Sequence, residues 1–334
     1  MKVLVHFQIN PKNDIFEGAR LRKTIKSALE MNNAPYANTS MDDFDIAHFV
    51  YVESDNIIDE LKERHIPIVV SALYCENDPC ASYLEYKYKN GERSYSLKSK
   101  AIRFLEKANL ILVPNDAAKN ILEASGINNR IEICPLGVNL TRFDFSRDDE
   151  KDIFYRYFSC NKENKVVVAI GNAYLEGLST IATVANLCQD THFYYFYKPE
   201  KAKLNKEDKK ILKNLPNNLI ISNLVADDIY RSALINADMC LLLTYRPVGT
   251  ITILEAMAAK CQLVVREQEL LKEIAVDQKT AYVANYSETL VEIIKEYLEG
   301  KLKPTINEAY KIVRQNDINA FGKRLLDIYQ SLIK

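Results

Sequence analysis

The segment from Met239 to Val265 constrains the fold of this chain more than any other. An apolar run, Met239 to Leu243, leads through a loop with a glycine into a helical pattern that opens near Thr250. A second apolar run follows at Gln262 to Val265. A strand, a helix and another strand in this order predict a βαβ unit whose two strands are parallel. The segment therefore predicts an α/β protein.

Apolar runs and amphipathic helical patterns also alternate through the first half of the chain. The predicted strands are Val3 to Phe7, Ile46 to Val52, Ile66 to Val70, Leu110 to Val113 and Ile131 to Pro135. The predicted helices are Ala19 to Met31, Ile57 to Glu63, Lys98 to Lys107 and Asp116 to Ala124. This alternation predicts a Rossmann-like domain, a parallel sheet with helices on both faces.

The alternation restarts after a charged, turn-rich stretch, Phe143 to Lys165. A chain of 334 residues fits two domains of ordinary size. We predict two Rossmann-like domains, residues 1–150 and residues 151–315, that face each other across a cleft. The further predicted strands are Lys165 to Ile170, His192 to Tyr197, Asn218 to Ser222, Met239 to Leu243 and Leu263 to Val265.

The overall charge and the cysteines bound the class of function. The formal net charge is −1, so nothing favours nucleic acid as a partner. The seven cysteines are scattered and lack C-x2-C spacing, which argues against a metal site. The chain begins MKVLVHF, without a signal-peptide pattern, and has no apolar run of membrane-spanning length. We therefore expect a cytoplasmic protein.

The helix that opens near Thr250 predicts an anion site. Its N-terminal backbone N–H groups, at Gly249, Thr250 and Ile251, have no partners within the helix and lie at the positive end of the helix dipole. Glu255 lies about one turn further in, where its carboxylate could accept hydrogen bonds from the hydroxyls of a ribose. The alternative is that Glu255 is an ordinary surface carboxylate.

This segment resembles the donor-binding signature of the retaining family 4 glycosyltransferases, E-x7-E with LEAMA around the second glutamate. LEAMA stands at Leu254 to Ala258, and Pro247 stands where the first glutamate belongs. Pro135 to Asn139, followed by Arg142 and Phe143, is similar to the interdomain segment of that family.

Two further segments carry the same resemblance. Asn223 to Val225, ahead of Asp227, Asp228 and Tyr230, is similar to the family's nucleobase-binding loop. The terminal helix, Phe321 to Lys334, resembles the family's last helix, which packs back on the first domain; residues 316–334 are assigned to it.

The resemblance implies the GT-B fold and the transfer of a hexose from a nucleotide sugar, a UDP-sugar in the first place, with no tightly bound cofactor and no metal. The segment VREQELLKEI is similar to bacterial diacylglycerol glycosyltransferases, which implies a lipid-linked or cell-envelope glycan acceptor.

Three donor-site positions depart from the family pattern. Asn172 stands near the family's arginine, Glu176 near its lysine, and Pro247 at its first glutamate. A carboxylate beside a pyrophosphate repels it, so other cations would have to replace the missing pair. Arg246 and Arg266 are the nearest candidates, with surface salt bridges as their alternative role. The departures also motivate a second hypothesis, a catalytically silent partner subunit of an active glycosyltransferase.

The loop after the first strand is the second candidate contact. In the family, a glycine-containing loop here approaches the donor phosphates and the acceptor. Glu17, Gly18 and Arg20 stand at this place; Gly18 permits close backbone approach and Arg20 could meet phosphate. A plain turn before a helix is the alternative.

The segment from Tyr83 to Lys107 interleaves basic and aromatic residues, which suits an anionic membrane surface. Lys98, Lys100 and Arg103 are the candidate contacts, and they predict a peripheral position on the inner face of the membrane. A solvated helix covering the first sheet is the alternative interpretation.

No catalytic residue can be assigned from the sequence. Asp43-Phe44-Asp45 matches a metal-binding DxD pattern, but its context favours the entry into a buried strand. The histidines are interpreted as core or surface residues rather than as bases: His6, His48, His65 and His192.

Overall fold

The computed structural model describes residues 1–7, 17–50, 55–74, 84–89, 92–145, 148–171, 177–196, 206–222, 225–243 and 250–333. Within these ranges it describes the backbone alone at residues 17, 55, 84–95 and 148–149. The chain forms two compact units. One comprises Met1–Asn139, Pro247–Thr252 and Gln315–Lys334, and the other comprises Leu140–Arg246 and Ile253–Arg314. The domain limits near residues 150 and 315 stay predictions.

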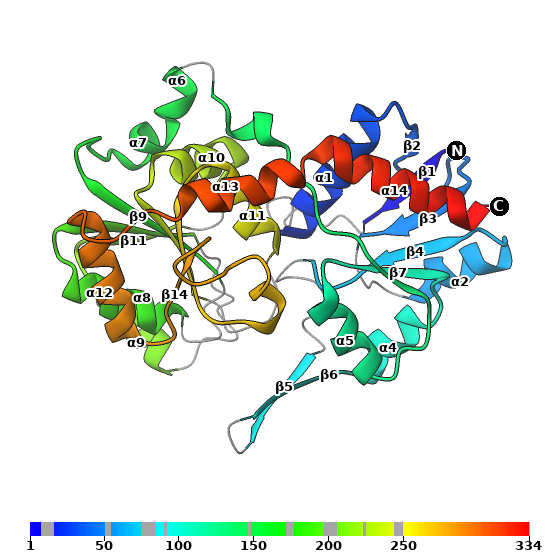
Figure 1. Cartoon of the computed structure of the whole chain (residues 1–334), viewed down its shortest axis with the longest axis horizontal. Helices are drawn as coiled ribbons and strands as arrows, with labels where there is room; N and C mark the ends of the chain where they lie inside the picture. Colours follow the sequence, from blue (N-terminus) through cyan, green and yellow to red (C-terminus); the bar gives the residue numbers. More distant parts are fainter. Residues whose placement is uncertain are drawn as a thin grey trace. The chain divides into compact units, whose positions relative to one another are not determined.

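The first unit contains a six-stranded parallel sheet in the order β2-β1-β3-β4-β7-β8 (Figure 1). Every residue of β3, β4 and β7 is buried, as expected for parallel strands covered on both faces. The strands are β1 (Val3–His6), β2 (Tyr36–Ala37), β3 (Ile46–Phe49), β4 (Ile68–Ser71), β7 (Leu110–Val113) and β8 (Ile131–Ile133). The helices are α1 (Glu17–Met31), α2 (Asp55–Glu63), α4 (Ser99–Leu105), α5 (Asp116–Ala124) and α14 (Ile318–Ile333).

Glycines bring the last helix close to the rest of the first unit. A Cβ at Gly322 of α14 would lie 2.4 Å from the carbonyl oxygen of Ala28 in α1, so only glycine permits this approach. A Cβ at Gly137 would lie 2.4 Å from the Cβ of Phe321. The close packing of α14 therefore requires glycine at positions 137 and 322.

The second unit contains another six-stranded parallel sheet, in the order β11-β10-β9-β12-β13-β14. Its strands are β9 (Lys165–Ile170), β10 (Thr191–Phe196), β11 (Leu219–Ser222), β12 (Met239–Leu242), β13 (Gln262–Val265) and β14 (Tyr282–Val283). Its helices are α6 (Asp148–Lys151), α7 (Ile153–Phe158), α8 (Gly177–Leu187), α9 (Lys206–Lys213), α10 (Asp227–Asn236), α12 (Ser287–Leu298) and α13 (Ile306–Gln315). The predicted α/β class, with two parallel sheets, is confirmed.

The strand order of the second sheet marks where a ligand is expected. From β9 the chain continues to β10 on one side, and β12 pairs with β9 on the other, so the order reverses between β9 and β12. Ligands of open α/β sheets bind beyond the carboxyl ends of the strands at such a switch point. Helix α11 (Thr250–Ala258) is the helix that follows β12.

The interpretation of Tyr83 to Lys107 as a solvated helix is wrong for its first half. Strands β5 (Leu84–Lys89) and β6 (Glu92–Leu97) form an antiparallel pair in which Lys89 is opposite Glu92. Figure 1 shows this hairpin at the edge of the first unit. The two residues between the strands in the sequence are Asn90 and Gly91. Asn-Gly between alternating residues is a strong hairpin signal, and it predicts this structure better than the charge pattern does.

The stretch from Phe143 to Lys165 contains more structure than its composition predicts. Helices α6 and α7 occupy its middle, and Phe154 of α7 is fully buried. Its ring lies edge-on to Tyr194 of β10, with 4.8 Å between the ring centroids. Buried aromatic area outweighs the turn signals of the charged residues around it.

Candidate functional site

Helix α11 places a carboxylate in an apolar helix. Six of its nine residues are apolar or alanine, and all nine are buried, with Glu255 only 1% exposed. The alternative interpretation of Glu255 as a surface carboxylate is therefore wrong. An ionised group at this depth needs charged or hydrogen-bonding partners, because desolvation otherwise favours its neutral form.

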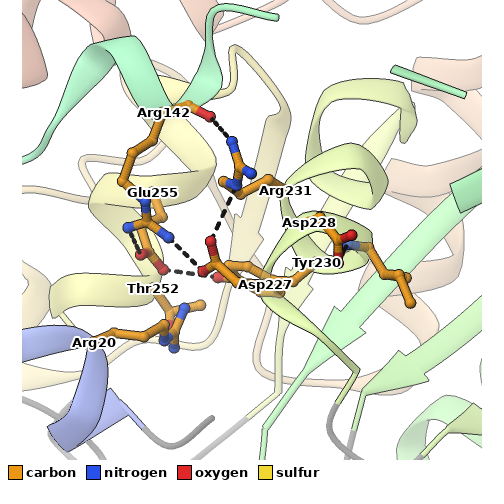
Figure 2. Close-up of polar contacts among 9 residues, drawn as sticks. Arg20, Arg142, Asp227, Asp228, Tyr230, Arg231, Thr252 and Glu255 are labelled. Carbon is orange, nitrogen blue, oxygen red and sulfur yellow. Dashed lines mark hydrogen bonds and ion pairs between the residues drawn. The ribbon is translucent and has the colours of Figure 1, made fainter. Parts of the chain in front are cut away.

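Two side chains hold the Glu255 carboxylate. Arg142, in the short 3-10 helix η2 (Leu140–Phe143), donates from Nη1 to Oε1 at 3.1 Å. Tyr230 of α10 donates its hydroxyl to Oε2 at 3.0 Å. Figure 2 shows the two donors approaching the carboxylate from different elements of the second unit. Each oxygen of the carboxylate is therefore fixed by a separate partner.

Arg142 also contacts a second carboxylate. Its Nη2 donates to Oδ1 of Asp227, in the first turn of α10, at 2.5 Å. Arg231 donates from Nε to the other oxygen of Asp227 at 3.1 Å and from Nη1 to the carbonyl oxygen of Arg142 at 2.7 Å. The Arg231 guanidinium also lies over the ring of Phe145, 4.8 Å from its centroid. We call Arg142, Asp227, Tyr230, Arg231 and Glu255 the carboxylate network.

The charges of the carboxylate network balance. Two arginines face two carboxylates, and the guanidinium fork of Arg142 joins the two acids. The Glu255 side chain is 2% exposed, whereas those of Arg142 and Asp227 are 24% and 39% exposed. A carboxylate has about four acceptor positions, so the two bonds described do not by themselves exhaust Glu255.

The start of α11 is tied to other parts of the first unit. Thr250 donates from Oγ1 to the carbonyl oxygen of Tyr74 at 2.8 Å. Arg20 of α1, which is 8% exposed, donates from Nη2 to Oγ1 of Thr252 at 3.0 Å. Thr252 and Glu255 are three residues apart on the helix, so they lie on the same side of it. Figure 2 draws both contacts of this side, at Thr252 and at Glu255.

The remaining predicted residues divide into buried, exposed and undescribed ones. Ile251 and Val225 are 3% and 5% exposed, and Gly18 is buried at the start of α1. Lys98, Lys100 and Arg103 are all exposed at α4. Predicted residues outside the described part of the chain are Asn172, Glu176, Arg246, Pro247 and Gly249, and the side chain of Glu17.

Arg266 is not a surface residue. It is 3% exposed and donates from Nη2 to Oγ1 of Thr180, in α8, at 2.6 Å. The alternative role of Arg266 in a surface salt bridge is therefore wrong. The Thr180 hydroxyl lies on α8, the helix that follows β9.

The sequence alone does not indicate that Arg142, Asp227 and Tyr230 belong to the carboxylate network. The sequence places Arg142 in the segment after Asn139, and Asp227 and Tyr230 in the helix after Val225, without indicating that they contact Glu255. The signal that could have found them is the burial expected for Glu255 in LEAMA, since a buried carboxylate requires a cation. The tertiary fold decides which cation pairs with Glu255, because Arg142 is 113 positions away from Glu255 in the sequence.

Two of the histidine and acidic candidates, His48 and Asp45, have partners within the first unit. His48 is fully buried, and its Nδ1 and Nε2 lie 2.6 Å from the Tyr329 hydroxyl and 2.8 Å from Ser71 Oγ. Burial lowers the pKa of His48 to about 3. Asp45 accepts from the backbone N–H of Lys2 at 2.7 Å, which fixes the start of the first sheet.

The described residues contain neither a metal-binding cluster nor a membrane-spanning helix. No group of histidine, cysteine and acidic side chains there could hold a metal ion. Among the helices that the structure describes, none combines the length and the apolar character of a membrane span.

The chain is similar over its whole length to known glycosyltransferases. No family model matches it. It is 22% identical over 345 residues to the processive diacylglycerol alpha-glucosyltransferase of Acholeplasma laidlawii, covering 100% of this chain and 99% of that protein.

Solved structures show the same fold. Anabaena Alr3699/HepE, solved in complex with UDP-glucose, matches with a TM-score of 0.72 and 14% identity, over 99% of this chain and 100% of that one. WaaG, a glycosyltransferase involved in lipopolysaccharide biosynthesis, matches with a TM-score of 0.65 and 16% identity, over 98% and 99%. With its two parallel sheets and these relatives, the chain is a glycosyltransferase of the GT-B fold.

Proposed function

We propose that this protein is a retaining family 4 glycosyltransferase that transfers a hexose from a UDP-sugar to a lipid-linked or cell-envelope glycan acceptor. The observation that carries the proposal is the Glu255 carboxylate, buried in α11 and held by Arg142 and Tyr230. HepE was solved with UDP and with UDP-glucose, and the A. laidlawii relative is named for the transfer of glucose to diacylglycerol. The HepE complexes support a UDP-sugar donor, and the name of the A. laidlawii relative supports a lipid acceptor.

In this proposal, the first turn of α11 binds the pyrophosphate of the nucleotide, and Glu255 in the second turn binds its ribose. The N–H groups at its N-terminus take the pyrophosphate, where the helix dipole favours negative charge. Glu255 accepts hydrogen bonds from the ribose hydroxyls. Arg20, which already bonds Thr252 on this helix, is the proposed cation beside the departing diphosphate. Arg20 would thereby take over part of the work of the family's arginine and lysine.

The proposed lipid acceptor places the enzyme at a membrane surface. Lys98, Lys100 and Arg103 are exposed at α4, and each cation close to an anionic bilayer contributes about 1 kcal/mol. We expect sedimentation with anionic liposomes to fall when all three are changed to alanine. The matched control is the triple alanine variant of the exposed Lys209, Lys210 and Lys213 of α9. Equal loss in the two variants would remove α4 from the proposed membrane contact.

The donor is tested by calorimetric titration with UDP and UDP-glucose, together with an assay of UDP-glucose hydrolysis. We expect both ligands to bind and the donor to be hydrolysed slowly without an acceptor. Glu255→Ala should weaken UDP binding at least tenfold, while Glu60→Ala, at an exposed glutamate of α2, should not. A wild-type protein that binds neither ligand would overturn the proposal.

The relatives do not support the hypothesis of a silent subunit. Two of them are named as transferases, and the third was solved in complex with UDP-glucose. The residues that motivate it, Asn172, Glu176 and Pro247, lie outside the described part of the chain. The hydrolysis assay decides this question too, because a silent subunit would bind UDP-glucose without turnover.

A further inference from the structure

We propose that Arg142 is a positioning residue for nucleoside recognition, which acts by holding Glu255 in place against α10. The inference rests on the proposed function, in which Glu255 contacts the ribose. It adds a residue that contacts the nucleotide only through another side chain. Arg142 would thereby set how well the protein binds any ligand that carries the ribose.

The first support is the geometry of the fork. A guanidinium presents two parallel donors at a fixed spacing, and Arg142 uses one on Glu255 of α11 and the other on Asp227 of α10. The two helices are therefore joined through a single planar group. A lysine has one ammonium on a flexible stem, and it lacks the rigid fork with which Arg142 contacts both carboxylates.

The second support is that Arg142 is itself held in place. Arg231 donates to its backbone carbonyl at 2.7 Å and shares Asp227 with it, and the Arg142 guanidinium lies over the Phe143 ring at 5.6 Å. A side chain fixed at its backbone and at its head transmits position rather than charge alone. Tyr230 fixes the other oxygen of Glu255 from the same helix, α10.

The third support is the place of α10 in the chain. The helix begins at Asp227, directly after Val225 and Ala226, and Val225 belongs to the segment that resembles the nucleobase-binding loop. The fork of Arg142 therefore connects the carboxylate proposed for the ribose with the helix that follows the proposed nucleobase segment. A nucleoside presents base and ribose at a fixed separation, so the separation of these two protein elements has to match it.

The test measures UDP affinity by calorimetry in single and double variants. Arg142→Met removes the fork but keeps the length of the side chain, and Arg142→Lys keeps the charge without the fork. We expect about a tenfold or larger rise in the Kd for UDP with Met and an intermediate rise with Lys. The control is Arg64→Met, which removes an exposed arginine that directly follows α2 and pairs with Glu60; it should leave the Kd within twofold of wild type.

A double variant separates positioning from a general loss of structure. If Arg142 acts through Glu255, changing Arg142 to Met in the Glu255→Gln background should alter the Kd for UDP less than twofold. A tenfold further loss in that background would overturn the inference, as would an unchanged Kd in Arg142→Met alone. If Arg142→Met does not fold, Arg142→Lys carries the same comparison. A wild-type protein that does not bind UDP would instead overturn the proposed function, and this inference with it.

Discussion

His48 in the first unit and Glu255 in the second are both buried titratable groups, and the chain stabilises them in opposite ways. His48 lies between two hydroxyls, those of Tyr329 and Ser71, at 2.6 and 2.8 Å, and burial keeps its imidazole neutral. Glu255 is 1% exposed, and its carboxylate is matched by the charge of Arg142. One group is neutral in the core, and the other is paired.

The difference indicates which of the two is built to meet a ligand. A neutral imidazole with two hydroxyl partners needs nothing further and has no route to solvent through them, since Tyr329 is itself fully buried. The carboxylate network remains partly accessible through Arg142 and Asp227. Holding a buried charge costs more free energy than packing apolar groups of the same volume, so its retention suggests a use beyond stability.

The largest expected effect comes from breaking the charge pair. Arg142→Met should lower the free energy of unfolding by about 3 kcal/mol, because it removes a cation that pairs with the buried Glu255 carboxylate. We place the loss at the lower end for buried pairs because Arg142 is 24% exposed. Urea denaturation measures it. Adding Glu255→Gln should recover about half of the loss, and a double variant no more stable than Arg142→Met would contradict a charge-based explanation.

The next largest expected effect is the loss of stability at low pH that His48, the neutral buried group, should cause. The pKa of His48 is about 3 when folded, against about 6.5 in an unfolded chain. Between these values the unfolded chain binds a proton that the folded protein does not. The stability from this group is therefore fully present above pH 6.5 and is lost as the pH falls, by about 1.4 kcal/mol per unit. From pH 6 to pH 4 the loss is about 2 to 3 kcal/mol.

The measurement compares urea denaturation of wild type and His48→Gln at pH 6, 5 and 4. The variant should lose less stability on acidification than wild type, by about the amount given, whatever its stability at pH 7. His65→Asn changes an exposed histidine with a positive φ of 56°, which asparagine tolerates, and it should follow the wild-type slope. Parallel slopes for wild type and His48→Gln would show that His48 is not the source.

A tyrosine-to-phenylalanine change should lower the free energy of unfolding more at Tyr230, beside the charged Glu255, than at Tyr329, beside the neutral His48. Tyr230→Phe removes a hydroxyl that donates to the Glu255 carboxylate, and hydrogen bonds to charged groups contribute about 1.5 to 3 kcal/mol. We expect a loss of about 2 kcal/mol in urea denaturation at pH 7, together with weaker UDP binding. Retained stability with unchanged UDP affinity would remove Tyr230 from the carboxylate network.

Much of the fold follows from local patterns in the sequence. The bounds of β7, α5 and β9 agree with the predicted bounds residue for residue, because buried parallel strands and amphipathic helices have distinct periods. The β5–β6 hairpin was missed because charge and aromatic content were weighed above the Asn90-Gly91 turn signal.

The site was predictable in part. LEAMA identified Glu255, but the donors to its carboxylate, Arg142 and Tyr230, come from η2 and α10. Nothing within a few residues of Arg142 predicts an acidic partner, since the pairing exists only once the sheet order brings these elements together. The anion site at Gly249 and the roles of Asn172 and Glu17 stay predictions.

The smallest effect is expected at the neutral site. Tyr329→Phe removes the hydroxyl 2.6 Å from His48 Nδ1 and leaves that nitrogen buried without this partner, which should cost about 1 kcal/mol. Its control is Tyr286→Phe, at a tyrosine 73% exposed, where the change should stay within about 0.5 kcal/mol. Because no charge is uncovered, UDP affinity should not change. A loss at Tyr329 as large as that at Tyr230 would mean that burial alone, and not the charge of the acceptor, sets the cost of removing a hydroxyl in this protein.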